Sequence, residues 1–186
     1  GWPTLFRRVP EAMTAYIPAG AAGMLIILLG SHSLYHWAHH SAIVHDAVLH
    51  AKAGYLNLPF WAARAAVILA LWWVFARAIV MNSRLQDRGG VELTHRNKRL
   101  SAAFLVIFGA TFTIASIDWV MSLEPHWYIT IFPWYMFGGA FLHALAAIAL
   151  LSVLLNRRGL FPEFNEHHRH DLGKYVFGFG VFWAYL

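Results

Sequence analysis

The sequence predicts an all-α integral membrane protein, a transmembrane helical bundle with four complete spans and one truncated span. Of its 186 residues, 59% are hydrophobic and only 12% are charged, about half the charged share of an average soluble domain. No formally charged residue lies between Glu11 and Asp46, or between Glu124 and Arg157. Each run exceeds the ~20 residues that a helix needs to cross a bilayer. The runs lack the alternation of barrel strands, so the spans are predicted to be helices.

The individual spans follow from the limits of the apolar runs. Leu58-Pro59 opens the second span, because proline is tolerated in the first turn of a helix. A very short turn containing Pro125 separates the third span from the fourth. The last apolar segment begins near Leu172 and ends after 15 residues, which is too short to cross a bilayer. Since Gly1 is not an initiator methionine, we interpret residues 1–186 as one transmembrane region of a larger subunit. The spans are placed at approximately 14–36, 58–82, 100–122, 129–155 and 172–186.

Basic residues are distributed unequally between the two sets of loops. The two loops that follow the first and third spans contain Lys52 as their single Lys or Arg. By the positive-inside rule, these two loops lie outside and the basic loops lie in the cytoplasm. This topology also accounts for the net charge of +5 without a nucleic-acid partner. The basic set consists of Arg7, Arg8, Arg84, Arg88, Arg96, Lys98, Arg99, Arg157, Arg158 and Arg169.

Ionisable side chains inside a span are costly and are therefore candidate functional residues. Arg64 lies about six residues into the second span and Asp118 about four residues from the end of the third, at depths of about 9 and 6 Å. These depths predict that the two side chains pair. The pair is interpreted either as a structural salt bridge or as a proton-accepting carboxylate tuned by a cation.

The turn between the third and fourth spans contains two further titratable side chains. Glu124 and His126 flank Pro125, and a carboxylate beside a histidine can accept and pass on protons near neutral pH. Trp127 and Tyr128 also fit the ordinary aromatic belt of a membrane protein. The turn is therefore a candidate proton-transfer site, with an interfacial anchor as the alternative.

Histidines gather at the end of the first span. His32, His36 and the pair His39-His40 recur at intervals of three to four, which would place them on one helical face. Such a face could ligate a metal or, with His143 of the fourth span, a non-covalent haem. The alternative is a polar helix end at the membrane surface. His143 lies near the middle of its span and is either a proton-relay residue or a histidine bonded to a neighbouring helix.

Two charged residues flank the predicted start of the fifth segment. Asp171 and Lys174 are candidates for a proton entry point on the basic side. The alternative is a helix start with a favourably placed acidic residue. The chain has no cysteine, which excludes thiolate-bound iron–sulfur clusters, covalently attached haem c and thiol nucleophiles.

The run Asp118-Trp119-Val120-Met121-Ser122-Leu123-Glu124-Pro125-His126-Trp127-Tyr128 resembles the F subunit (ActF) of bacterial alternative complex III, a quinol:cytochrome c oxidoreductase. That subunit is similar to the NrfD-like membrane subunit of polysulfide reductase. The resemblance extends along nearly the whole chain. Further agreeing stretches are Arg7-Arg8-Val9-Pro10-Glu11, Leu34-Tyr35-His36-Trp37, Lys52-Ala53-Gly54-Tyr55-Leu56-Asn57-Leu58-Pro59-Phe60, Asp171-Leu172-Gly173-Lys174 and Phe182-Trp183-Ala184-Tyr185.

The resemblance implies a multi-pass subunit of about ten spans in the bacterial inner membrane, with the His-rich loop and the turn after Asp118 in the periplasm. It implies a complex of respiratory or photosynthetic electron transfer that oxidises a quinol such as menaquinol. This chain would carry no redox cofactor. Partner subunits would hold iron–sulfur clusters and haem c, and another partner would be a paralogous NrfD-like subunit.

Oxidation of a quinol releases two electrons and two protons, so we expect this chain to contribute to quinol binding, to proton translocation, or to both. Asp118, Glu124 and His126 are the expected outer half-channel or quinol-headgroup site, with Arg64 setting its charge balance. The inward half-channel would use His143, Asp171 and Lys174. Two alternatives remain open: a haem b-binding cytochrome subunit with histidine ligands, and a non-catalytic membrane scaffold. For the haem alternative, the outer position of His32 and the central position of His143 are poorly matched.

Overall fold

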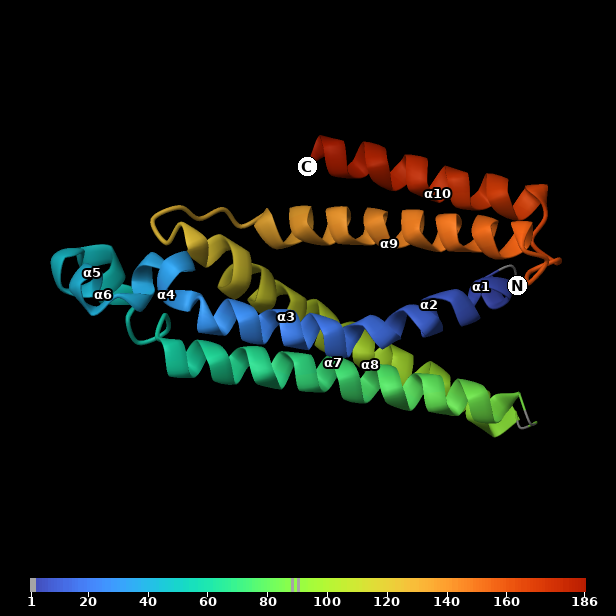
Figure 1. The fold of residues 1–186 in the computed structure, drawn as a ribbon, viewed down its shortest axis with the longest axis horizontal. Coiled ribbons are helices and arrows are strands. Elements are labelled where there is room, and N and C mark those ends of the chain that lie inside the picture. The colour runs from blue at the N-terminus through green and yellow to red at the C-terminus, as the bar shows by residue number, and fades with distance from the viewer. Residues whose placement is uncertain (1–2, 88, 90) are drawn as a thin grey trace. The chain divides into compact units, whose positions relative to one another are not determined.

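A computed structural model shows an all-helical chain (Figure 1). The structure describes residues 3–87, 89 and 91–186, and no strand occurs among them. Four helices of this described part are long and apolar enough to cross a membrane. The predicted all-α class with membrane-spanning helices is thus confirmed at the level of helix length and hydropathy. The four helical stretches are Arg8–Leu29, Leu58–Gln86, Leu93–Leu123 and Phe132–Arg157.

The first apolar helix ends earlier than the sequence predicts. After the short helices α1 (Pro3–Phe6) and α2 (Arg8–Met13) and the 3-10 turn η1 (Thr14–Tyr16), α3 covers Ile17–Leu29. Gly30 follows, and α4 (Ser31–Leu34) adds a single turn before Tyr35 becomes extended, with φ −106° and ψ 113°. The continuous helix thus stops at a glycine, before the approximate limit of residue 36 that the apolar run predicts.

The segment between the first two apolar helices folds into short helices. These are η2 (His36–Ala38), α5 (His40–His45) and α6 (Ala47–Lys52). Asp46 caps α6, because its Oδ1 accepts the N–H groups of Val48 at 2.8 Å and Leu49 at 3.2 Å. An N-cap carboxylate satisfies helix donors that have no partner within the helix. The segment is thus helical over much of its length, and the carboxylate of Asp46, its one acidic side chain, serves as a helix cap near its centre.

Two long helices form most of the central part of the chain. Helix α7 covers Leu58–Gln86 and begins under the cap of Asn57, whose side chain accepts the N–H of Phe60 at 3.1 Å. Helix α8 covers Val91–Ala115 and lies beside α7 (Figure 1). The same run continues as a π-helical segment, η3 (Ser116–Val120), and a 3-10 turn, η4 (Met121–Leu123). Aromatic pairs such as Trp72–Phe108, with ring centroids 5.4 Å apart, join the two helices.

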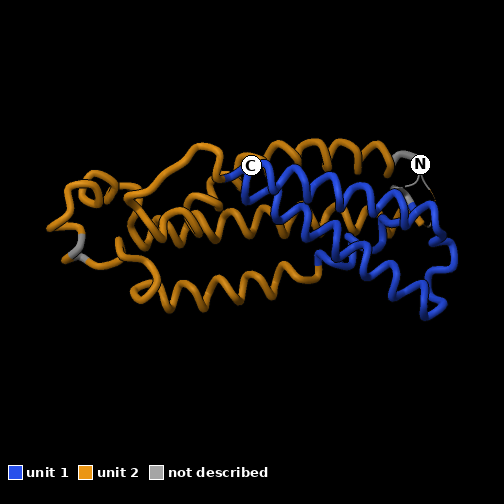
Figure 2. Tube along the Cα trace, turned by 90° about the horizontal axis from the view of Figure 1, so that it is seen from above, with its two compact units in different colours: residues 1–14, 133–186 blue, residues 15–132 orange. Residues whose placement is uncertain are grey.

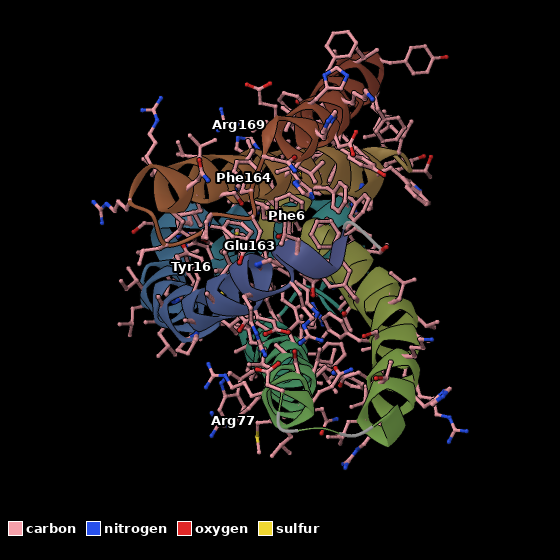
Figure 3. All side chains as sticks on the ribbon, turned by 90° about the vertical axis from the view of Figure 1, so that its right-hand side faces the viewer. Phe6, Tyr16, Arg77, Glu163, Phe164 and Arg169 are labelled. Atoms are coloured by element: carbon pink, nitrogen blue, oxygen red, sulfur yellow. The ribbon has the colours of Figure 1, made fainter. Side chains whose placement is uncertain are left out.

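The chain divides into two compact units (Figure 2): residues 15–132 form one, and residues 1–14 with 133–186 form the other. The second unit contains most of α9 (Phe132–Arg157) and all of α10 (Glu166–Tyr185). These helices pack through aromatic rings, including Phe141 against Phe179 with centroids 4.5 Å apart. In the same unit the ring of Phe6 lies edge-on to Phe164, with centroids 5.7 Å apart (Figure 3).

Helix α10 begins before the apolar segment that predicted it. Asn165 caps the helix and forms a capping box with His168, so the first turns are the polar stretch from Glu166. A capping box satisfies two helix-end donors and starts a helix regardless of hydropathy. Asp171 therefore lies beyond the first turn and is not the helix start expected from the sequence.

Candidate functional site

A buried aromatic cluster holds the end of the α8 run in the unit of residues 15–132. Tyr35, Trp37 and Trp61 are each about 1% exposed, and the rings of Tyr35 and Trp37 have centroids 4.9 Å apart. Trp61 Nε1 donates to the carbonyl of Asp118 at 2.8 Å. The Tyr35 hydroxyl and Trp37 Nε1 donate to the carbonyls of Trp119 at 2.9 Å and Ser122 at 3.0 Å. Three donors thus fix the segment in which the regular α-helix gives way.

Within this segment, Asp118 forms a buried ion pair with Arg64 of α7. Arg64 Nε lies 2.6 Å from Asp118 Oδ2, and the side chains are 12% and 1% exposed. The pairing predicted from their matching depths is confirmed. Arg64 also donates through Nη1 to the carbonyl of Tyr55 at 3.1 Å. Its guanidinium lies 3.9 Å from the Tyr55 ring and 4.2 Å from the Phe60 ring, at the distance of cation–π contacts.

The ion pair leaves one acceptor and one donor unused. Asp118 Oδ1 and Arg64 Nη2 are both buried and have no hydrogen-bond partner among the described residues. A buried polar atom without a partner costs free energy, so an O–H donor would stabilise Asp118 Oδ1 and an acceptor oxygen would stabilise Arg64 Nη2. A water molecule or the hydroxyl of a ligand has that chemistry.

Tyr55 adds a hydroxyl to the surroundings of this pair. Burial, and next the interaction of its hydroxyl with the Asp118 carboxylate, raise the pKa of Tyr55 to about 12, while Arg64 acts in the opposite direction. The hydroxyl therefore stays protonated at physiological pH and can serve as a neutral donor. Tyr55 is not predicted from the sequence as a site residue, since a tyrosine just before a span is ordinarily an interfacial anchor.

The turn after η4 carries a second group of titratable side chains. His126 Nε2 lies 2.6 Å from Asp46 Oδ2, and His126 Nδ1 lies 3.6 Å from Glu124 Oε1. Lys52 Nζ donates to the carbonyl of Pro125 at 2.5 Å. Neither Asp46 nor Lys52 was identified as a site residue, although they are the only formally charged residues in the segment 36–57. The low number of charged residues in this segment was the sequence feature that could have pointed to Asp46 and Lys52.

Backbone and side-chain hydrogen bonds change the acidity of Asp46. Partial desolvation acts to raise its pKa, but the N–H groups of Leu49 and Val48, together with His126, outweigh this effect and lower it. Asp46 is thus a carboxylate at all physiological pH values and acts only as an acceptor.

The predicted histidine face is not formed. His32 and His36 lie on separate helical segments because the chain is extended at Tyr35. His39 Nε2 lies 2.7 Å from the carbonyl of His32 and the two rings have centroids 5.5 Å apart, whereas the side chain of His40 lies outside the described residues. Among the His, Asp and Glu side chains that the structure describes, no group of three could hold a metal ion.

The remaining candidates lie in the unit that contains residues 133–186. His143 Nδ1 bonds the carbonyl of Gly139, one turn earlier in α9, at 2.7 Å, so it does not need a neighbouring helix to satisfy that nitrogen. Lys174 Nζ lies 3.5 Å from Asp171 Oδ1 in an exposed pair within α10. Exposed pairs of this kind contribute little to stability, and the pair has the geometry of an ordinary helix surface contact.

Comparison with known proteins adds no family: no protein-family model matches the sequence, and no curated protein matches it.

Proposed function

We propose that this chain is a membrane subunit of a bacterial quinol:cytochrome c oxidoreductase, similar to the F subunit of alternative complex III, and that it contributes to quinol binding and proton transfer. The observation that carries the proposal is the buried Arg64–Asp118 pair with one free acceptor and one free donor. The resemblance of the Asp118–Tyr128 run supports the same conclusion. Iron–sulfur clusters and haem c would be on partner subunits. A further partner would be a paralogous NrfD-like subunit.

The free atoms suit a quinol hydroxyl. Asp118 Oδ1 would accept its O–H hydrogen, and Arg64 Nη2 would donate to its oxygen. As the quinol loses two electrons to partner subunits, its two O–H protons must leave. Asp118 is the first acceptor in this scheme, because a carboxylate has free electron pairs, while Arg64 offsets the buried negative charge. The water-exposed pair Glu124 and His126 would then deliver the protons to solvent.

The proposed setting is the bacterial inner membrane, with the basic loops in the cytoplasm. The turn at Glu124 and His126 then faces the periplasm, and quinol protons are released there. His143, Asp171 and Lys174 are the proposed candidates for an inward half-channel. The support for this orientation is the near absence of Lys and Arg in the two outer loops, since such a bias sets the topology of membrane proteins.

The test compares Asp118→Asn and His126→Ala in the assembled complex, with quinol oxidation and proton release measured together. We expect each variant to slow both rates by about 100-fold, the lower end of the effect of removing a positioned proton acceptor. Glu163→Gln is the matched control, because this carboxylate is exposed and belongs to the other unit.

Unchanged rates in both variants, with normal subunit content, would overturn the proposed roles. A pyridine haemochrome assay on the same preparation tests the claim that this chain carries no haem. Stoichiometric protohaem that disappears in His143→Ala would instead support the cytochrome b alternative.

A further inference from the structure

Two carboxylates face opposite nitrogens of one imidazole ring. Asp46 Oδ2 lies 2.6 Å from Nε2 of His126, and Glu124 Oε1 lies 3.6 Å from Nδ1. Asp46 and His126 are 80 positions apart in the sequence, so the fold alone creates the contact. Asp46 is held in turn by the first N–H groups of α6. The ring is thus oriented by a side chain that is itself fixed.

The contact with Asp46 determines which nitrogen of His126 carries hydrogen in the neutral ring. Asp46 is ionised, because its pKa is lowered, and an ionised carboxylate only accepts hydrogen bonds. Nε2 must therefore be the donor in the 2.6 Å contact. The neutral ring then has its free electron pair on Nδ1, the nitrogen that faces Glu124.

The side of the ring that faces Glu124 is suited to proton exchange. The separation of 3.6 Å is longer than a direct hydrogen bond, and the exposed side-chain fractions of 46% for His126 and 70% for Glu124 admit a bridging water. In the Nε2–H form of the ring, Nδ1 is an acceptor that faces the carboxyl oxygen of Glu124, and a proton on Nδ1 can be shared with that oxygen. The other charged group at this turn is Lys52, whose ammonium is engaged by the carbonyl of Pro125.

We propose that Asp46 is a positioning residue that makes Nδ1 of His126 the proton-accepting nitrogen, and that protons pass from Nδ1 to Glu124 and then to water. In the transfer, the Nδ1–H bond breaks and an O–H bond forms on Glu124, directly or through one water. The imidazolium returns to its neutral Nε2–H form, and Glu124 then releases the proton to solvent. This inference rests on the proposed function for the source of the protons, the quinol.

Replacement of Asp46 by serine separates positioning from helix capping. Serine is a favoured N-cap residue, so Asp46→Ser keeps the start of α6, but its single short oxygen cannot also reach His126. Asp46→Glu restores a carboxylate. The structural readout is solid-state NMR of the ¹⁵N-histidine-labelled complex in lipid bilayers, with the His126 signals identified by their loss in His126→Gln.

We expect neutral His126 to show a hydrogen-bonded Nε2–H signal and an unprotonated Nδ1. Asp46→Ser should abolish the Nε2–H signal through exchange with water, and Glu163→Gln should leave it unchanged. In turnover, Asp46→Ser should lower kcat by less than the roughly 100-fold that loss of the proton-transferring group itself costs, at unchanged KM for quinol, with partial recovery in Asp46→Glu. A merely structural role for Asp46 would not produce this separation of kcat from KM.

The outcomes distinguish this inference from the function on which it rests. If neutral His126 carries hydrogen on Nδ1, or if Asp46→Ser leaves both the Nε2–H signal and kcat unchanged while Asp118→Asn stops turnover, then the positioning role is overturned and the proposed function stands. If the Nε2–H signal disappears as expected but neither Asp46→Ser nor Asp118→Asn affects turnover, then the proposed function fails and with it the proton transfer to Glu124.

Discussion

At the scale of single residues, the Arg64–Asp118 pair shows what sequence reasoning reached and what it missed. Two ionisable residues at similar depths in adjacent spans were sufficient to predict the pair. The sequence did not reveal that Trp61 holds the Asp118 carbonyl or that one oxygen of the carboxylate has no partner within the described part of the chain. Both depend on contacts between elements that are far apart in the chain. Removing one partner of such a buried pair costs about 3–5 kcal/mol, so variants of Asp118 require a check of folding.

Acidification should release the cap of α6 and the contact between Asp46 and His126. The folded pKa of Asp46 is lowered from its ordinary value of 3.8. Its stabilising contribution is therefore complete above pH 3.8 and is lost as the pH falls through the lower folded value. We expect the amides of Val48 and Leu49 to lose protection in hydrogen exchange in that range, after correction for the intrinsic rates.

The amide of Phe60 is the control for this measurement. It is capped by Asn57, whose amide side chain does not titrate, so its protection should not follow the same curve. Equal loss of protection at both caps would indicate general acid unfolding and would contradict a specific role for Asp46.

At the scale of elements, the third apolar run changes its helical type where the site lies. The sequence predicts one span over 100–122, but the structure has a π-helical segment at Ser116–Val120 after α8. Segments of π-helix occur frequently at functional sites. Hydropathy cannot distinguish an α-helix from a π-helix, since the residues are equally apolar in both. The donors that stabilise the irregular segment come from Trp61, Tyr35 and Trp37, so the change is decided by tertiary contacts.

The packing of α10 on α9 depends on a glycine. A Cβ added at Gly139 would lie 3.0 Å from Nε1 and 3.2 Å from Cε2 of Trp183, closer than carbon atoms normally pack. Small residues at helix interfaces allow such close approach in membrane proteins. We expect Gly139→Ala to have a free energy of unfolding about 1–3 kcal/mol lower than that of a glycine-to-alanine change without a close neighbour, as overpacked sites do, measured by thermal or denaturant unfolding in detergent.

Gly178→Ala in α10 provides the matched control, because a Cβ there has no neighbour within 4 Å. Alanine is the better helix former by roughly 1 kcal/mol, so this variant should be neutral or slightly stabilised. Equal stability of the two alanine variants would contradict the close contact at Gly139.

At the scale of the whole molecule, the alternation of basic and non-basic loops predicts the topology. The natural absence of cysteine allows the topology to be read with single introduced cysteines. Tyr128 is 76% exposed and Leu160 is 70% exposed, and they lie in a non-basic loop and a basic loop, respectively. We expect a membrane-impermeant maleimide to label Tyr128→Cys in intact cells but Leu160→Cys only after permeabilisation.

The cysteine-free parent is the control for labelling of other proteins. Labelling of both positions from the same side would contradict the alternation of spans. The reverse pattern would keep the spans but invert the proposed orientation, and it would place the Asp46–His126–Glu124 group on the cytoplasmic side.

The sequence by itself determined the helical class, the four long apolar helices and the pairing of Arg64 with Asp118, whereas the sidedness of the loops stays a prediction. These properties depend on composition, on apolar runs of about 20 residues and on the position of a residue within its span. Each can be counted along the sequence without knowing which distant residues meet. The prediction that the histidines share one helical face was wrong. It assumed a continuous helical period, and the extended residue Tyr35 interrupts that period.

Only the tertiary structure decided the environment of the site. It brought Asp46 to His126, Lys52 to Pro125 and Trp61 to Asp118, across separations of 80, 73 and 57 residues. It also left Asp118 Oδ1 without a hydrogen-bond partner among the residues that the structure describes. Such contacts depend on how α7, the end of the α8 run with the turn after it, and the folded segment between the first two apolar helices meet. Hydrogen bonds require specific distances and directions that no periodicity encodes.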